Sequence, residues 1–391
     1  MVAAAGRRAV GERAVAVISY LTTIHLDFGA VDRLAEELAR LGVRRPLLVA
    51  DRGIEAAGIL GRVRARIPNE LAVACFLDTP ANPTEAAVRR ALEAFRAGGC
   101  DGIVAVGGGS PIDLAKAVAL ASTHPGPLRD YALIEGGLAR IRPDLPPLVA
   151  IPTTAGTGSE VGRGAVIVVE DGRKLALVSP HLIPKLAICD PELTMGLPPL
   201  LTAATGMDAL IHCIETFLSP AINPPADAIA LDGLGRAAAF LERAVADGSD
   251  REARWQMMVA AMEGAMAFQK GLGAVHAMSH PLGALPGKPL HHGTLNAVIL
   301  PTVLAFNAGQ VGEKYARVRE VARLSADTDL SEWIRGLNRR LGLPESLRAM
   351  GVEEADLEGL PALAERDHCN ASNPRPATAA DYARLYREAL G

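Results

Sequence analysis

Four of the chain's nine histidines fall in one short stretch, Ala274–Gly293, which reads AVHAMSHPLGALPGKPLHHG. His276 and His280 are four residues apart, and His291 and His292 follow a loop of glycines and prolines. Side chains four apart share one face of a helix and can point at one ion. A lone histidine on a helix is more often a hydrogen-bonded core residue, but this concentration predicts a metal site.

A second pair at the same spacing lies in ATGMDALIHCIE, where Asp208 precedes His212 by four residues. One carboxylate with two or three imidazoles suits Fe²⁺ or Zn²⁺, whereas a structural zinc or Ca²⁺ site would call for thiolates or more acids. An open coordination position would make the site catalytic. Glu215, three residues beyond His212, either orients a ligand or lies on a solvated helix face.

Residues 103–116 read IVAVGGGSPIDLAK, which predicts a buried strand, a glycine turn and a helix that begins at Ser110 with Pro111 in its first turn. Such a turn lets backbone N–H groups approach a phosphate at the positive end of a helix dipole. The pattern is not GxGxxG, so a simple tight turn is the alternative.

Two further polar loops follow apolar strands. Asp51 ends LLVAD, where a carboxylate can accept hydrogen bonds from ribose hydroxyls and repel a 2′-phosphate, which favours NAD over NADP. The loop IPTTAGTGSE at 151–160 offers hydroxyl groups among glycines. Because the carboxyl ends of parallel strands meet at one sheet edge, we expect the three loops to form one ligand site there.

The elements that would position these residues change in kind along the chain. Before about residue 195, apolar runs alternate with amphipathic stretches, which predicts a parallel sheet with helices on both faces. The expected strands are Leu47–Ala50, Ile103–Val106 and Leu148–Ile151, with a first strand at Ala14–Leu21, and the expected helices include Val31–Leu41 and Glu85–Ala97.

After Leu197 the strand signals almost vanish. We expect an α/β dinucleotide-binding domain over 1–197 and an all-helical metal-binding and catalytic domain over 198–391. Its helices are expected at Thr202–Leu218, Ala226–Ala246, Asp250–Phe268, Val311–Leu324, Ser331–Leu341 and Thr378–Leu390, the last with Thr378 and Asp381 spaced as a capping box.

Composition excludes several classes of protein. A formal net charge of −4 with scattered arginines argues against a nucleic-acid or anionic-membrane partner. The five cysteines are odd in number and form no CxxC pair, so neither a disulfide framework nor a thiolate zinc site is indicated, and a reducing cytoplasm fits. The longest N-terminal apolar run is too short to span a bilayer.

The motifs together resemble the group III, iron-dependent alcohol dehydrogenases, whose fold is shared by dehydroquinate synthase and glycerol dehydrogenase. The resemblance runs nearly end to end and rests on FGAVDRLAEEL, LLVADRGI, NPT at 82–84, VGGGSPIDLAKA, IPTTAGTGSEV, LPPLLTAATGMDALIHCIE, GLGAVHAMSHPLGA, HHGTLNAVILP and NPRPATAADYARLY.

The resemblance implies an NAD- and iron-dependent enzyme, Zn²⁺ being possible, that forms a homodimer. It implies that the metal ligands are Asp208, His212, His276 and His292, and that His280 is the active-site histidine near the nicotinamide. It also implies cofactor contacts from Asp51, Asn82, Gly108, Gly109, Ser110, Asp113, Thr153, Thr154, Thr157 and Lys174.

The chain departs from the family pattern in three places. The loop between His280 and His292 is two residues longer than is common, which leaves a choice between His291 and His292 as the ligand. Gly162 and Gly164 stand where larger side chains are usual, which predicts a roomier pocket. Lys270 replaces a smaller or amide residue.

We expect hydride transfer between NAD(H) and a small primary alcohol or aldehyde in the cleft between the domains. Lys270 and Lys288 flank the histidines, so one of them could pair with a carboxylate and make the substrate an ω-hydroxy acid such as 4-hydroxybutyrate. Both could instead be solvated surface lysines. An NAD- and metal-dependent lyase of the dehydroquinate synthase kind is the alternative. A non-catalytic scaffold is disfavoured, because it would not need the metal-binding and the cofactor-binding motifs together.

Overall fold

A six-stranded parallel sheet organises the N-terminal half in the computed structural model, which describes residues 22–391. The strand order is β1–β8–β5–β4–β2–β3. The strands are β1 (Thr23–Leu26), β2 (Pro46–Val49), β3 (Ala74–Phe76), β4 (Gly102–Gly107), β5 (Leu148–Pro152) and β8 (Leu186–Cys189). The three interior strands predicted from sequence correspond to β2, β4 and β5, whereas the strand expected at Ala14–Leu21 lies outside the described residues.

Both faces of this sheet are buried, which explains why its strands are continuous apolar runs. Leu47 and Val49 face a core that includes residues of α4 and α5, while Leu48 and Ala50 face a core shared with α1 and α3. The predicted parallel sheet with helices on both faces is confirmed. The helices are α1 (Leu34–Arg40), α2 (Arg52–Ala56), α3 (Ile59–Arg64), α4 (Glu85–Ala97) and α5 (Gly109–Thr123).

Two details of this half differ from the prediction. Helix α5 begins at Gly109 with Gly108 as its N-cap, so Ser110 lies inside the first turn and donates its hydroxyl to the carbonyl of Ala81. The antiparallel hairpin of β6 (Gly164–Val168) and β7 (Lys174–Val178) was not anticipated. It brings Val166 and Lys174 to the cleft described below.

From Pro199 onward the described residues form no β-strand, and the longer elements are α-helices. They are α6 (Pro199–Leu218), α7 (Pro224–Ala246), α8 (Arg251–Ala267), α9 (Ala274–Leu282), α10 (His292–Asn307), α11 (Lys314–Val321), α12 (Leu330–Arg340), α13 (Leu360–Arg366) and α14 (Ala379–Leu390). The predicted capping box of Thr378 and Asp381 is present at α14. The division at residue 197 stays a prediction.

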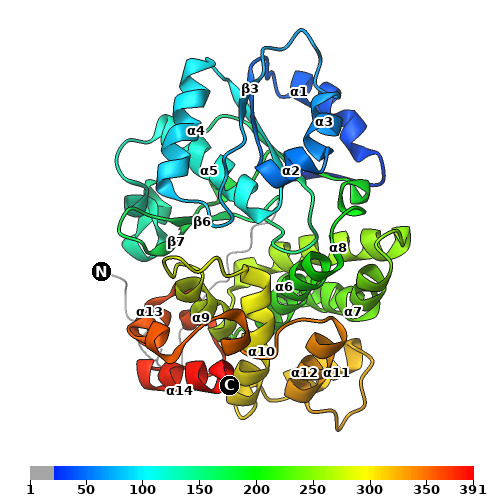
Figure 1. The fold of residues 1–391 in the computed structure, drawn as a ribbon, viewed down its shortest axis with the longest axis vertical. Coiled ribbons are helices and arrows are strands. Elements are labelled where there is room, and N and C mark those ends of the chain that lie inside the picture. The colour runs from blue at the N-terminus through cyan, green and yellow to red at the C-terminus, as the bar shows by residue number, and fades with distance from the viewer. Residues whose placement is uncertain (1–21) are drawn as a thin grey trace.

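Helix α6 is the centre of this half, because every residue from Thr202 to Leu218 is buried. It packs against α7, α8 and α10. Figure 1 shows the sheet above and the helices below, with α6, α9 and α10 on the side of the helical half that faces the sheet. A residue on α6 is therefore held rigidly beneath the carboxyl edge of the sheet.

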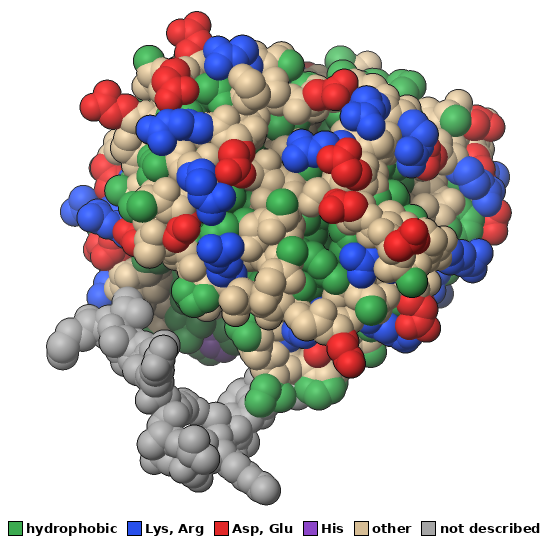
Figure 2. All heavy atoms as spheres, turned by 90° about the horizontal axis from the view of Figure 1, so that it is seen from below, with side chains coloured by type: hydrophobic (Ala, Val, Ile, Leu, Met, Phe, Trp, Pro, Cys, Tyr) green, Lys and Arg blue, Asp and Glu red, His purple; other side chains and the backbone are tan. Residues whose placement is uncertain are grey.

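The face in Figure 2, seen from below, carries positive and negative side chains interspersed with apolar ones. No single-sign stripe of the kind that tracks a nucleic acid is visible on that face. None of the helices within 22–391 combines the length and the apolarity that crossing a bilayer requires.

Candidate functional site

A cleft of about 1130 Å³ lies between the carboxyl edge of the sheet and the helical half. Loops that follow β2, β4 and β5 form one wall, and residues of α6, α9 and α10 form the other. The sheet wall lies where open α/β sheets bind ligands. The cleft wall includes all ten residues that the resemblance links to the cofactor, namely Asp51, Asn82, Gly108, Gly109, Ser110, Asp113, Thr153, Thr154, Thr157 and Lys174.

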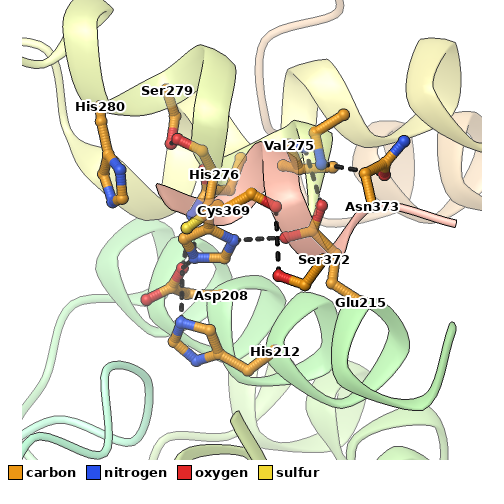
Figure 3. A network of polar contacts seen from close by, with 12 residues as sticks. Asp208, His212, Glu215, Val275, His276, Ser279, His280, Cys369, Ser372 and Asn373 are labelled. Atoms are coloured by element: carbon orange, nitrogen blue, oxygen red, sulfur yellow. Dashed lines mark hydrogen bonds and ion pairs between the residues drawn. The ribbon is translucent and has the colours of Figure 1, made fainter. Parts of the chain in front are cut away.

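One carboxylate and three imidazoles meet at the helical wall. Asp208 and His212 project from α6 one turn apart, His276 comes from α9, and His292 opens α10. The Nε2 atoms of His212 and His276 each lie 3.9 Å from Oδ1 of Asp208, and Nε2 of His292 lies 3.8 Å from the same atom. Figure 3 shows the first three side chains converging. The structure thus brings all four predicted metal ligands together.

The chemistry of this group fits a divalent metal. Burial lowers the pKa of His212 to about 4 and the pKa of His292 well below its ordinary value, so both rings are neutral and offer a lone pair. Among the described residues, Nδ1 of His292 and Oδ1 of Asn296 are buried without a hydrogen-bond partner. One carboxylate with three imidazoles is a ligand set that suits Fe²⁺ or Zn²⁺.

Glu215 orients one of these ligands. It lies two turns along α6 from Asp208 and is buried, so the solvated-face interpretation is wrong. Its Oε2 atom lies 2.6 Å from Nδ1 of His276, and its Oε1 atom accepts the N–H of Val275 at 2.7 Å (Figure 3). A carboxylate on Nδ1 keeps the proton there and turns the Nε2 lone pair toward Asp208.

Asn296 is a member of the site that the sequence reasoning missed. Its Nδ2 atom lies 2.7 Å from Oδ1 of Asp208, 3.2 Å from Nε2 of His276 and 3.1 Å from Nε2 of His292. It follows His292 by four residues on α10, the spacing already used for the other pairs. That spacing was the available signal, but an asparagine is a weaker sign of metal binding than a histidine.

His280 lies beside the metal-ligand group and lines the cleft. Its ring centre is 5.9 Å from those of both His276 and His292. Its Nδ1 atom donates to Oδ2 of Asp367 at 2.8 Å. Burial acts to raise the pKa of Asp367, but the neighbouring His280 and His368 outweigh burial and lower it well below its ordinary range. Asp367 is therefore a charged acceptor for the Nδ1–H of His280, and Nε2 is the ring nitrogen that this contact leaves free.

The two adjacent histidines at the start of α10 have different positions. His292 points at Asp208, whereas Nδ1 of His291 accepts the backbone N–H of Thr294 as the N-cap of the helix. Gly293 allows this arrangement, because a Cβ there would lie 2.2 Å from the carbonyl oxygen of Ala204 on α6. The geometry thus favours His292 over His291 as the ligand.

The glycine turn after β4 packs tightly against the loop after β5. A Cβ on Gly108 would lie 3.2 Å from the hydroxyl of Thr154, and a Cβ on Gly109 would lie 2.7 Å from the hydroxyl of Thr157. The glycines therefore let the two loops approach each other at the N-terminus of α5. In the same wall, the buried Oγ1 of Thr153 has no hydrogen-bond partner among residues 22–391.

The two predicted cofactor carboxylates differ in availability. Asp51 caps α2 through Oδ1, which accepts the N–H of Ile54 at 2.9 Å, and its carboxylate still lines the cleft. Both oxygens of Asp113 are already engaged, by the hydroxyl of Ser159 at 2.5 Å and the N–H of Val166 at 2.9 Å. Asp113 therefore holds the cleft wall together more than it presents a free acceptor.

The lysine hypothesis for a substrate carboxylate is wrong. Lys270 is buried and bonded to Asp227 and the carbonyl of Phe217. Lys288 is bonded to Asp356 and the carbonyl of Gly351. Neither residue lines the cleft. Both lysines therefore satisfy partners of their own. Lys270 is buried, whereas 27% of the Lys288 side chain is exposed.

The two glycines near the pocket also differ in effect. A Cβ on Gly162 would lie 2.9 Å from Cζ of Phe268, so an aromatic ring fills the space that a larger residue would take. A Cβ on Gly164 would meet no heavy atom closer than 3.9 Å. Space is left beside Gly164, whereas at Gly162 the prediction of extra room is wrong.

Comparison with known proteins assigns the family. Residues 22–191 match the sequence profile described as iron-containing alcohol dehydrogenase, and residues 202–390 match the C-terminal profile of the Fe-containing alcohol dehydrogenase family. The chain belongs to the iron-containing alcohol dehydrogenase family. The predicted resemblance is confirmed, and this iron-containing alcohol dehydrogenase is an enzyme of the oxidoreductase class.

Relatives and solved structures agree with this assignment. A 4-hydroxybutyrate dehydrogenase from Cupriavidus necator is 57% identical over 383 residues, which cover 96% of this chain and 100% of that protein. A 1,3-propanediol oxidoreductase structure has a TM-score of 0.87 at 36% identity and covers 96% of this chain and 100% of its own. A sulfoacetaldehyde reductase from Bifidobacterium kashiwanohense, solved with NAD⁺, has a TM-score of 0.85 at 28% identity, with 97% and 100% covered. These matches favour the dehydrogenase prediction over the lyase.

Proposed function

We propose that this iron-containing alcohol dehydrogenase oxidises 4-hydroxybutyrate to succinate semialdehyde with NAD⁺, and catalyses the reverse reduction. The 57% identity with a 4-hydroxybutyrate dehydrogenase over 96% of the chain carries the choice of substrate. The reaction moves a hydride from the carbinol carbon to NAD⁺ and releases the hydroxyl proton. The products are therefore the aldehyde, NADH and one proton.

In this proposal Asp208, His212, His276 and His292 hold Fe²⁺, which Zn²⁺ can replace. When bound, the metal supplies a Lewis acid that stabilises negative charge on the substrate oxygen, and NAD⁺ supplies the hydride acceptor. The glycine turn after β4 offers backbone N–H groups to the cofactor's phosphates. Asp51 offers a carboxylate to the ribose hydroxyls.

His280 would handle the proton. With Nδ1–H donated to Asp367, Nε2 of His280 is the nitrogen that can accept a proton in the cleft. The Asp367 carboxylate stabilises the positive charge that the ring then carries. Because His280 is buried next to His276 and His292, the ring is held in place before substrate binds.

We propose Arg163 as the cation for the substrate's carboxylate. It does not line the cleft, so its side chain must turn toward the substrate on binding. It precedes β6, between the two glycines discussed above, and donates from Nη2 to the carbonyl of Gln269 at 3.0 Å. Neighbouring Phe268 packs edge-on against His212, with ring centres 5.4 Å apart. Burial lowers the pKa of Arg163, and no acidic group among the described residues acts to raise it.

A substrate comparison tests the proposal. NADH formation is followed with 4-hydroxybutyrate and with neutral 1,4-butanediol, for wild type and Arg163→Met. Loss of a charge-assisted hydrogen bond of about 1.5–3 kcal/mol should raise KM for the acid by about 10–100-fold and leave the diol unaffected. Arg173→Met is the matched control, since Arg173 lies on the hairpin but is already paired with Asp171.

Two outcomes would count against these assignments separately. Equal effects of Arg163→Met on both substrates would remove Arg163 from carboxylate binding. A wild type that turns over the diol but not 4-hydroxybutyrate would refute the proposed substrate.

We also propose a cytoplasmic homodimer. The family resemblance supports the dimer, and the five unpaired cysteine thiols are consistent with a reducing compartment. Light scattering of the purified protein tests the oligomeric state, and a monomer at micromolar concentration would refute it.

A further inference from the structure

A second group of metal-ligating side chains includes His280 and adjoins the Asp208 group. It combines His280 at the end of α9 with Asp367, His368 and Cys369, which begin the short 3-10 helix η10 (His368–Ser372). One ligand atom from each of the four residues lies within 4.8 Å of the others. Asp367, His368 and Cys369 are consecutive, but His280 precedes Asp367 by 87 positions. No sequence motif therefore marked the group.

The contacts within this group are at least as short as those of the proposed catalytic site. Nδ1 of His280 lies 2.8 Å from Asp367 Oδ2, and Nδ1 of His368 lies 3.4 Å from Asp367 Oδ1. Nε2 of His368 lies 3.4 Å from Sγ of Cys369. The corresponding distances around Asp208 are 3.8–3.9 Å. Modest side-chain movement would therefore let one ion contact all four residues.

The donor set differs from the catalytic one because it contains sulfur. Two imidazoles, a carboxylate and a thiolate suit a borderline or soft divalent ion, whereas the Asp208 group has no thiolate. The side chain of His368 is 26% exposed, so an ion can reach the group from solvent. Cys369 is buried, and burial with the nearby Asp367 raises the pKa of its thiol well above the ordinary value. The thiol is thus protonated unless a metal displaces the proton.

We propose that His280, Asp367, His368 and Cys369 form a second, thiolate-containing binding site for Zn²⁺ and similar ions, and that its occupation inhibits the enzyme. Coordination at Nδ1 displaces the proton that His280 shares with Asp367. In a neutral ring the single proton must then move from Nδ1 to Nε2, so that nitrogen no longer accepts a proton in the cleft. The inhibition rests on the proposed function of His280, but ion binding itself does not.

The test uses Co²⁺ as the probe, because Co²⁺–thiolate bonds absorb strongly in the near ultraviolet and imidazole or carboxylate ligands do not. The metal-stripped full-length protein is titrated with Co²⁺ under anaerobic conditions. We expect two equivalents to bind, one of them with thiolate absorption. Cys369→Ser should remove that absorption and lower the Co²⁺ affinity of the thiolate-containing site about tenfold or more. The Co²⁺ affinity of the Asp208 site should not change. Cys189→Ser, which removes a different buried thiol, should change neither.

A single bound equivalent, or thiolate absorption that survives Cys369→Ser, would overturn the proposal. His368→Ala provides a second variant. It should lower the Co²⁺ affinity of the thiolate-containing site and leave Co²⁺ binding at the Asp208 site intact. Inhibition is then measured with excess Zn²⁺, which should inhibit wild type and spare His368→Ala. Since the Co²⁺ absorption needs no turnover, failure of the proposed substrate would leave the binding result intact.

Discussion

The contact between Glu215 and His276 should set how tightly the metal is held. Glu215 uses one oxygen on Nδ1 of His276 at 2.6 Å and the other on the N–H of Val275 at 2.7 Å. In Glu215→Gln the amide oxygen can accept only one of these donors. The amide NH₂ group must then face the other N–H. The imidazole either turns or loses the negative charge that makes Nε2 a better ligand.

Loss of a carboxylate that orients a metal-bound histidine lowers metal affinity by about 10–100-fold in other proteins, which is about 1.4–2.8 kcal/mol. We expect Glu215→Gln to lie in this range, because both of its contacts are short and buried. His276→Ala removes the ligand itself and should lower the metal affinity further than Glu215→Gln does. The ordering of the two variants distinguishes orientation of the ligand from its removal.

The assay is a competition titration of the metal-stripped protein against a chromophoric chelator, with Fe²⁺ or Zn²⁺, without oxygen. Glu263→Gln is the control, because burial and the nearby Asp232 raise the pKa of Glu263 to about 8 and glutamine resembles its protonated form. Unchanged metal affinity in Glu215→Gln, with the thermal unfolding of both variants like that of wild type, would refute the orienting role.

Two further substitutions probe other parts of the site. Asp367→Asn should lower kcat about 10–100-fold with little change in KM, because His280 loses its charged partner, and steady-state kinetics should show no added loss when His280→Ala is combined with it. An additive double variant would argue against the pair acting together. Gly293→Ala should destabilise the fold by about 1–3 kcal/mol in denaturant titration, since its Cβ would lie 2.2 Å from the carbonyl oxygen of Ala204. If Gly293→Ala unfolds with the same free energy as wild type, α10 can move away from Ala204 without loss of stability, and the prediction is wrong.

The parts of the fold and site that follow local rules could be predicted from sequence. The pair Asp208 and His212 lies in the helix expected at Thr202–Leu218, and a helix fixes which side chains share a face. Helices α9 and α10 were not among the expected helices. Glu85–Ala97 was predicted with the bounds that α4 has, because Thr84 caps it and glycines follow it. The ten cofactor residues lie in one cleft wall since loops after parallel strands meet at one edge.

The parts that depend on long-range contacts could not be predicted. Glu215 and Asp367 matter through the histidines that they touch, which lie 61 and 87 positions away. Lys270 looked available in sequence, but Asp227 lies 43 positions away and already pairs with it. The hairpin of β6 and β7 was missed although its strands are as long as β5, because it forms a separate two-stranded sheet outside the alternation of strands and helices.

The central claim is that the Asp208 group holds a metal required for NAD-linked oxidation of 4-hydroxybutyrate. The direct measurement is NADH formation by anaerobically purified, metal-stripped protein with 4-hydroxybutyrate, before and after addition of one equivalent of Fe²⁺, for wild type and His276→Ala. We predict that wild type gains activity on Fe²⁺ addition and that His276→Ala does not. Full activity of the metal-stripped wild type, or of His276→Ala, would contradict the claim.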